Sequence, residues 1–348
     1  MYTVFHSVKY NPPVNTDKRK KPKGLFRSFA INSAVFLMAA ALMTGCAGNP
    51  DSGSIQESAA ETNVSDTISF TDDLGREVIT PRPRRVIAMI GSFADIWHLA
   101  GGEDTLVGTA HDAWTSFDLN LSESVVDLGG VKEPNLETIL AAQPDFILAS
   151  IQTTANLELM ETFEQAGIPV AYFEVSGFDD YLRMLKICTE LTGKPEYYTT
   201  NGSDVEKQVS QVLARQTGEA PKVLCIRATG SSCKVKNSTG TVLGEMLHNL
   251  GCVNIADSDA SLLENLSMES IIAADPDYIF VVLQGADATD AQQTMEKTLL
   301  ANPAWNHLRA VQNGNFHVME HRLYNLKPNA RWGYAYEKLA DILYPETK

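Results

Sequence analysis

Two stretches of the chain are near copies of one another, ETILAAQPDFI (Glu137–Ile147) and ESIIAADPDYI (Glu269–Ile279). They are identical at seven of eleven positions and begin 132 residues apart. Each joins a short helical pattern to a Pro-Asp turn and then to an apolar run, a unit common to α/β proteins. Independent use of that unit is the alternative, but this degree of identity favours duplication. A single repeat of such long period predicts two related lobes rather than a solenoid.

Short apolar runs alternate with helical patterns around both copies. Before them, Ile68–Thr80 predicts a β-hairpin that turns at Asp72–Gly75. The candidate strands are Arg85–Ile90, Thr105–Ala110, Asp145–Ser150, Pro169–Val175, Lys222–Arg227 and Asp277–Leu283. The candidate helices are Phe93–Ala100, Leu136–Ala142, Asn156–Gln165, Thr241–Leu250 and Met268–Ala274. This alternation predicts an α/β fold with parallel sheets covered on both faces.

A segment rich in helix formers, Asp179–Gln216, separates the two patterns. Pro195 suits a first helical turn, so Pro195–Gln216 predicts one helix of about 22 residues, or about 33 Å. Asn201-Gly202 weakens it by about 1 kcal/mol. The expected organisation is a lobe at 67–178, a helical segment at 179–217 and a lobe at 218–348. A single helical bridge predicts that a cleft between the lobes opens and closes little.

The first 45 residues are typical of an export signal. Basic residues around Lys18–Lys21 precede Ala34–Met43, an apolar run that is too short to span a membrane comfortably. Small residues then lead to Cys46, and residues 47–66 are polar and read as a flexible tether. The alternative is an ordinary secretory signal in which Cys46 has no role.

Charge is unevenly distributed along the chain. The chain carries −15 in all; the first 45 residues, with seven Lys or Arg and one Asp, carry +6, so the remaining 303 carry −21. Because binding to phosphate backbones needs clustered Lys and Arg, the acidic body argues against nucleic acid as a partner.

The order of these features resembles the solute-binding lipoproteins of ABC importers, specifically the helical-linker family that binds ferric siderophores, haem and cobalamin. The resemblance runs from Ile68 to Pro345. It rests on LMTGC (Leu42–Cys46), DDLGREV (Asp72–Val78), RVIAMIGSFADIWHLAGG (Arg85–Gly102), the Asn135–Asp145 segment with its copy, and KPNARWG (Lys327–Gly333). It implies two Rossmann-like lobes joined by a long α-helix, with a ligand cleft between them.

The resemblance also implies partners and location. Cys46 would be lipidated and would hold the protein on the outer side of the cytoplasmic membrane. Glu137 and Glu269 would dock on arginines of an ABC permease dimer that carries its own ATPase subunits. The plainer interpretation is that both acids favour a helix dipole, worth about 0.3–1 kcal/mol each.

The ligand is expected at the carboxyl ends of the strands, where the lobes face one another. In the second lobe, Lys and Arg residues gather at the expected carboxyl ends of the strands. The Arg guanidinium suits the oxyanions of a ferric chelate. The candidate ligand-binding residues are Ser92, Trp114, Arg227, Lys236, Arg322, Tyr324 and Arg331. Surface charge or core packing is the plain alternative for each of them.

The histidines and cysteines of the sequence are too few at the expected cleft to specify a metal site. His111 and His321 are the candidates for a zinc or manganese receptor site. An axial haem ligand could be either of them, Tyr324 or Met319. The cysteines after Cys46 show no C-x-x-C spacing; they are Cys188, Cys225, Cys233 and Cys252. An exported location would permit disulfides among them. Cys225 falls in an expected strand and is expected to be a core residue.

Sequence signatures of catalysis are not found. The chain has no G-x-S-x-G, no H-E-x-x-H and no phosphate-binding glycine loop at a strand end. We therefore expect a binding protein with no catalytic residues and no cofactor, whose ligand is a ferric chelate of the siderophore type. Haem or cobalamin is the alternative ligand, and a zinc or manganese receptor is a lower one. A surface adhesion or sensor module is the remaining class.

Overall fold

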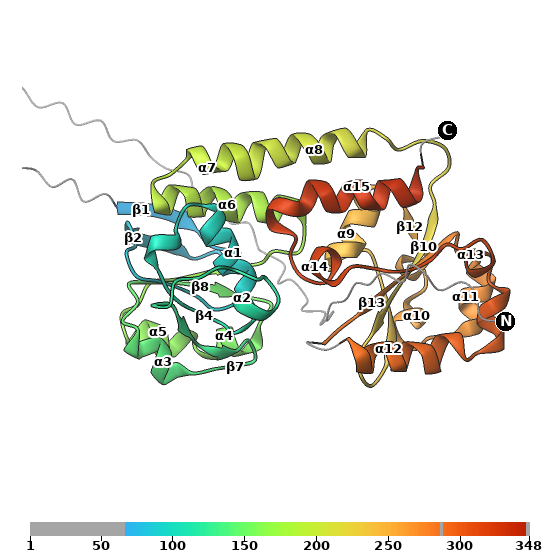
Figure 1. The fold of residues 1–348 in the computed structure, drawn as a ribbon, viewed down its shortest axis with the longest axis horizontal. Helices are drawn as coiled ribbons and strands as arrows, with labels where there is room; N and C mark the ends of the chain where they lie inside the picture. Colours follow the sequence, from blue (N-terminus) through green and yellow to red (C-terminus); the bar gives the residue numbers. More distant parts are fainter. Residues whose placement is uncertain (1–66, 286–287, 346–348) are drawn as a thin grey trace, which may run out of the picture. The chain divides into compact units, whose positions relative to one another are not determined.

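The structure is a computed structural model that describes residues 67–285 and 288–345 (Figure 1). The expected export signal, Cys46 and the tether lie outside the described residues. Within the described ranges, none of the helices combines the length and apolarity needed to cross a bilayer.

A β-hairpin opens the described chain, as predicted. β1 (Thr67–Thr71) pairs antiparallel with β2 (Glu77–Pro81). The buried Asp72 carboxylate closes the turn by accepting hydrogen bonds from the backbone N–H groups of Leu74 and Arg76. It also accepts one from the backbone N–H of Tyr172, so the turn is fixed to the first sheet.

The first lobe contains a five-stranded sheet of order β5-β4-β3-β8-β9 in which every pairing is parallel. Helices α1 and α6 lie on one face, and α3, α4 and α5 lie on the other (Figure 1). The strands are β3 (Val86–Ala88), β4 (Leu106–Thr109), β5 (Val126–Asp127), β8 (Phe146–Ser150) and β9 (Val170–Phe173), and β6 (Gly129–Gly130) pairs with β7 (Glu133–Pro134). The helices are α1 (Gly91–Leu99), α2 (Asp112–Thr115), α3 (Leu136–Ala141), α4 (Thr154–Glu158), α5 (Met160–Gln165) and α6 (Phe178–Thr192).

Alternation along the strands sorts the core of this lobe into two clusters. In β3, Ala88 belongs to one cluster and Ile87 to the other; in β8, Leu148 and Ile147 divide in the same way. Successive strand residues point to opposite faces, so each face has its own apolar layer.

The predicted helix at 156–165 is two helices, because the chain bends at Leu159 between α4 and α5.

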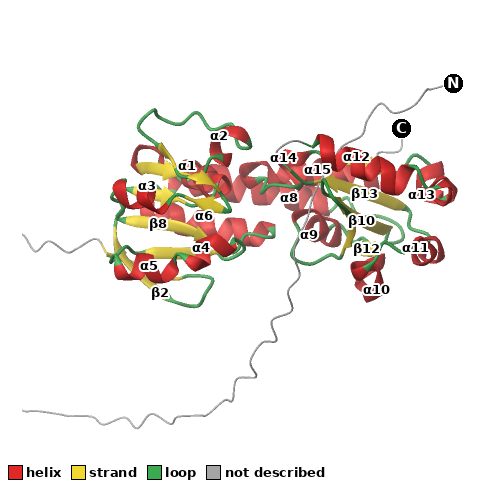
Figure 2. Cartoon of the chain, turned by 90° about the horizontal axis from the view of Figure 1, so that it is seen from below, coloured by secondary structure: helices red, strands yellow, loops and turns green. Residues whose placement is uncertain are grey.

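The second lobe repeats the arrangement with one addition. Its sheet has the order β11-β10-β13-β14, and β12 also pairs with β10. β11 runs antiparallel to β10, so the expectation of a purely parallel sheet is wrong here. The strands are β10 (Lys222–Ala228), β11 (Cys233–Lys236), β12 (Val253–Asn254), β13 (Tyr278–Leu283) and β14 (Phe316–Val318). The helices are α9 (Val242–Asn249), α10 (Ala260–Glu264), α11 (Met268–Ala274), α12 (Thr289–Met295), α13 (Arg309–Gln312), α14 (His321–Tyr324) and α15 (Trp332–Leu343); both sheets and their helices are seen in Figure 2.

The bridging helix is shorter than predicted and contains a defect at the expected place. Helical structure runs from α7 (Glu196–Tyr198) through a π-turn (Thr199–Ser203) to α8 (Asp204–Leu213). The π-turn contains Gly202, where an added Cβ would lie 2.9 Å from the Tyr198 ring. α8 packs along α15 of the second lobe, whereas α7 and the π-turn contact α6 of the first lobe, so the bridge is attached to both lobes (Figure 1).

The duplicated segments have the same local structure. In each lobe the aspartate of the Pro-Asp turn receives backbone hydrogen bonds from the start of the neighbouring strand: Asp145 from Arg85, and Asp277 from Lys222. The residue before the proline has positive φ in both, +48° at Gln143 and +45° at Asp275. The likeness of the two sequences is therefore a likeness of structure.

Candidate ligand-binding site

The strand orders place one switch point in each sheet. The chain leaves β3 for β4 on one side and returns as β8 on the other; it does the same from β10 to β12 and then to β13. Ligands of open α/β sheets bind in the crevice beside the carboxyl ends of such strands. In the first lobe this crevice lies by Ser92 and Gln152, and in the second by Arg227.

In the first lobe, the C-terminal segment occupies this position. The Asn329 side-chain amide donates to the Ser92 carbonyl oxygen (3.0 Å) and to Asp95 Oδ2 (2.7 Å). Lys327 Nζ lies 3.4 Å from Gln152 Oε1, and Arg322 Nη2 lies 2.9 Å from Asp95 Oδ2. We call Asp95, Arg322 and Asn329 the clasp, because they join α1 of the first lobe to the C-terminal segment of the second.

The clasp is largely buried and contains two opposite charges. Side-chain exposure is 15% for Arg322 and 13% for Asp95. Burial raises the pKa of Asp95, although Arg322 and the Asn329 hydrogen bond oppose the shift. The Arg322 guanidinium also lies 4.3 Å from the centroid of the Phe117 ring. Arg322, expected as a ligand contact, is therefore engaged by protein groups in this structure.

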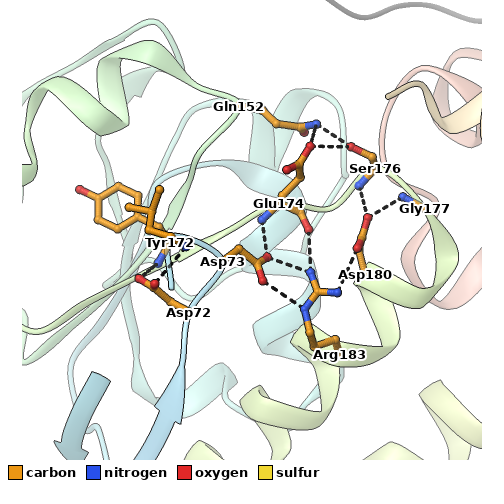
Figure 3. A network of polar contacts seen from close by, with 10 residues as sticks. Asp72, Asp73, Gln152, Tyr172, Glu174, Ser176, Gly177, Asp180 and Arg183 are labelled. Carbon is orange, nitrogen blue, oxygen red and sulfur yellow. Dashed lines mark hydrogen bonds and ion pairs between the residues drawn. The ribbon is translucent and has the colours of Figure 1, made fainter. Parts of the chain in front are cut away.

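A second polar network stiffens the same edge of the first lobe (Figure 3). Arg183 of α6 donates to both carboxylate oxygens of Asp73, at 3.1 and 2.9 Å, and to Asp180 at 3.0 Å. Asp73 accepts from the backbone N–H of Glu174, and Asp180 accepts from that of Gly177. The hairpin turn, the end of β9 and the start of α6 are thus held together.

Lys327 faces this acidic edge. Burial lowers its pKa to about 8, while Asp112, Glu174 and Asp180 act in the opposite direction. Burial likewise raises the pKa of Asp112 to about 6, although its carboxylate accepts a hydrogen bond from the Gly91 N–H. The first-lobe edge therefore already contains a cation from the second lobe.

In the second lobe, cations gather beside the switch point. β10 and β11 pair Cys225 with Lys236 and Arg227 with Lys234. Directly opposed residues of an antiparallel pair share a face, so Arg227, Lys234 and Lys236 project from one face of the sheet. Burial, followed by the charges of Arg227 and Lys234, lowers the pKa of Lys236 to about 8. We call these three residues the cation cluster.

A small pocket adjoins the cation cluster and is lined by Cys225, Ile226, Arg227, Lys236, Thr241, Leu243 and Val282. Lys236 lies on β11, a strand that is missing from the strands predicted from the sequence. Alternation of buried Cys233 and Val235 with Lys234 and Lys236 could have revealed that strand. Arg227 and Lys236 are therefore brought together by strand pairing.

The remaining sequence candidates are placed differently. Tyr324 is 2% exposed, and its hydroxyl donates to the Ala335 carbonyl oxygen. Ser92 is buried in the first turn of α1. Trp114 is half-buried against the core, and Arg331 is exposed near the clasp. Tyr324 and Ser92 offer little surface to a ligand here.

Both candidate histidines have polar neighbours. His111 Nδ1 lies 2.6 Å from Asp127 Oδ2 in a pair that is largely exposed. Burial and the nearby Arg322 lower the pKa of His321, whose Nε2 lies 3.0 Å from Asn325 Nδ2. Across the described ranges, no group of three or more His, Cys, Asp or Glu is arranged to hold a metal ion.

The cysteines after Cys46 are all buried free thiols: Cys188, Cys225, Cys233 and Cys252. Cys225 is a core residue of β10, as expected. Burial raises the pKa of Cys252 to about 12, so its thiolate is disfavoured at neutral pH.

The two expected docking acids occupy equivalent positions. Glu137 and Glu269 are the second residues of α3 and α11, and both are exposed. Asn135 and Ser267 cap these helices in the same way, each accepting a hydrogen bond from a backbone N–H three residues later.

Comparison with known proteins agrees with this architecture. The Fe(3+)-citrate-binding protein YfmC of Bacillus subtilis is 25% identical over 81% of this chain and 86% of its own length. The vitamin B12-binding protein of Pectobacterium carotovorum is 24% identical over 64% and 79%, respectively. The crystal structure of Staphylococcus aureus SirA complexed with staphyloferrin B has a TM-score of 0.60 at 22% identity, covering 80% of this chain and 97% of that one. Residues 86–323 match the family described as periplasmic binding protein, and the chain therefore belongs to that family.

Proposed function

We propose that the chain is the extracytoplasmic solute-binding component of an ABC importer, and that it captures a ferric complex of the siderophore type and delivers it to a membrane permease. Family membership and relatives named for ferric citrate and iron uptake support a transport role without catalysis. The cation cluster carries the choice of ligand. In a body of charge −21, three cations on one sheet face suit an anionic chelate better than a bare metal cation.

Arg227 is the principal ligand contact in this proposal. A guanidinium can bind a carboxylate through two parallel hydrogen bonds, and Arg227 lies at the carboxyl end of β10 beside the switch point. Lys236 adds a charge whose pKa is lowered first by burial and then by the charges of Arg227 and Lys234. An anion bound there relieves that repulsion. The first lobe contributes Trp114 as an aromatic surface, and the C-terminal segment of the second lobe contributes Arg331 as a further cation beside the clasp.

Haem and cobalamin are the alternative ligands. Relatives include the haem uptake protein IsdE of Staphylococcus aureus and the vitamin B12-binding protein. Haem carries two carboxylates that the cation cluster would suit, and His111, oriented by Asp127, would be a candidate axial ligand. A zinc or manganese receptor is a third candidate, and it would use His111 and His321.

Location follows from the residues before the fold. Residues 1–45 would direct export, a lipid on Cys46 would anchor the protein outside the cytoplasmic membrane, and residues 47–66 would give it reach. Glu137 and Glu269 would then dock on a permease dimer, because equivalent acids on duplicated lobes suit two equivalent arginines.

The ligand class is tested by thermal shift and visible absorbance on purified residues 47–348. The panel contains ferric citrate, ferric catecholates, ferric hydroxamates, haem, cobalamin, Zn²⁺ and Mn²⁺. A ligand present at 100 times its Kd raises the free energy of unfolding by about 2.7 kcal/mol. We expect stabilisation by a ferric chelate, lost in Arg227→Ala. A response to Zn²⁺ or Mn²⁺ alone would replace this proposal with the metal-receptor alternative.

A further inference from the structure

The duplicated helices expose a matching pair of large aliphatic side chains. Leu140 of α3 is 39% exposed and Ile272 of α11 is 47% exposed. They occupy the same position of the repeat, three residues after Glu137 and Glu269. In each helix the preceding residue, Ile139 or Ile271, is fully buried.

Acid, aliphatic and alanine share one face on both helices. Positions i, i+3 and i+4 of a helix are neighbours on its surface. Glu137, Leu140 and Ala141 stand in these positions on α3 and are all exposed. Glu269, Ile272 and Ala273 stand in them on α11 and are also exposed. We call these two sets the docking faces.

Local folding does not account for the docking faces. The buried Ile139 and Ile271 already fix each helix to its sheet, so exposed apolar residues at 140 and 272 are not needed there. Within residues 67–285 and 288–345, neither Glu137 nor Glu269 has an ion-pair partner. Both faces therefore present the same unused combination of charge and apolar surface.

We propose that Leu140 and Ile272 are the apolar anchors through which the two docking faces bind the permease dimer. This inference rests on the proposed function. Equivalent surfaces on the two lobes match a protein with two-fold symmetry. Each half of the permease dimer should therefore present the same complementary surface, a cationic side chain beside an apolar pocket. Exposed ion pairs alone are weak and are screened by salt. A desolvated apolar contact beside each ion pair would add the binding energy that an exposed ion pair does not provide. The small side chains of Ala141 and Ala273 let the permease approach each helix closely.

The test measures ⁵⁵Fe uptake by cells that express the full chain with its importer, supplied with ferric citrate or whichever ferric chelate the ligand panel selects. The variants are Leu140→Ser, Ile272→Ser and the two combined. Matched controls are Ile79→Ser and Val253→Ser, which remove aliphatic side chains of similar exposure, 58% and 53%, outside the repeat. Glu137→Arg with Glu269→Arg serves as the docking-defective reference. Ligand Kd and Tm are measured on each purified variant.

We expect the combined aliphatic variant to lower uptake by about tenfold, as loss of interface anchors does, with Kd and Tm unchanged and both controls at the wild-type level. Each single variant should lower uptake less, because one docking face remains. Wild-type uptake in the combined variant would overturn the inference while leaving the proposed function intact. An absence of uptake and of ligand binding by the wild type itself would overturn the proposed function instead.

The wild type and the combined variant also test two other binding partners for the docking faces, a lipid surface and a second copy of the chain. Binding of the purified wild type, but not of the combined variant, to phosphatidylglycerol–phosphatidylethanolamine vesicles lacking the permease would assign the faces to lipid. A dimer of the wild type in sedimentation that dissociates in the combined variant would assign them to a second copy. Either result overturns the permease assignment.

Discussion

The two lobes share their outer helices and differ at their inner edges. On the outside, α3 and α11 match in sequence, capping, burial and backbone strain. At the carboxyl edges the first lobe receives the C-terminal segment through the clasp, whereas the second adds β11 with Lys234 and Lys236. The duplicated feature is thus the one expected to meet a symmetric partner. The divergent feature is the one expected to meet the ligand.

This difference assigns separate tasks to the two edges. The first-lobe crevice contains Asn329 and Lys327, so it fixes one lobe to the other. The second-lobe crevice retains a cation cluster beside a small pocket. Four predictions compare the two lobes further, beginning with the one expected to have the largest effect.

Asp95→Ala should be the most damaging of these substitutions. It leaves the Arg322 guanidinium buried without its carboxylate, and breaking a buried pair in this way costs about 3–5 kcal/mol of the free energy of unfolding. Urea denaturation measures the loss. Asp204→Ala, which breaks the exposed pair with Lys207, is the matched control and should cost under about 1 kcal/mol. Equal losses in the two variants would show that the clasp does not hold the lobes.

Arg227→Ala should weaken binding of the ferric chelate by about 10- to 100-fold, the usual effect of losing charged hydrogen bonds. Fluorescence titration measures Kd. Arg309→Ala is the control, since Arg309 pairs with Asp275 and Asp277 by the amino end of β13 in the same sheet. A comparable loss in both variants would mean that the carboxyl edge has no special role.

The pH dependence of affinity should come from the second lobe. Lys236 has its pKa lowered to about 8, so it is charged below that pH and attracts an anion, and it loses that charge above it. Affinity for an anionic chelate should therefore fall several-fold between pH 7 and pH 9. Lys236→Gln should flatten the curve. Lys327→Gln, which removes the other lysine of pKa about 8 from the first-lobe edge, should leave the slope in place.

The smallest effect is expected at the two residues of positive φ, Gln143 and Asp275, which precede the prolines of the repeat. Gln143→Gly should raise the free energy of unfolding by about 0.5–1 kcal/mol, because glycine adopts positive φ without a Cβ clash. Asp275→Gly should gain less, since it also removes the Asp275–Arg309 ion pair. Thermal denaturation with calorimetry measures both, and an equal gain would mean that this exposed pair contributes nothing.

Local signals made the common architecture predictable. The helix–Pro–Asp–strand unit is encoded within eleven consecutive residues. The helix-weakening pair Asn201-Gly202 lies within the π-turn. The clasp could not be predicted in this way, because Arg322 and Asp95 are 227 residues apart and each alone resembles a surface charge. Arg227 and Lys236 were identified as cations near the carboxyl end of a predicted strand, but their shared face depends on β11, which was not predicted.

The two apolar clusters of the first lobe have unequal reach. The cluster on the α1 and α6 face continues through α8 and α15 into the second lobe, whereas the cluster that includes Ile139, Ile147 and Phe163 is confined to the first. Heating should therefore melt both lobes in one cooperative transition. The confined layer can open alone, so amide hydrogens of α3 and α5 should exchange with solvent sooner than those of α1 and α6. We therefore expect one docking face to lie on the layer of the first lobe that opens first, while the two lobes remain joined.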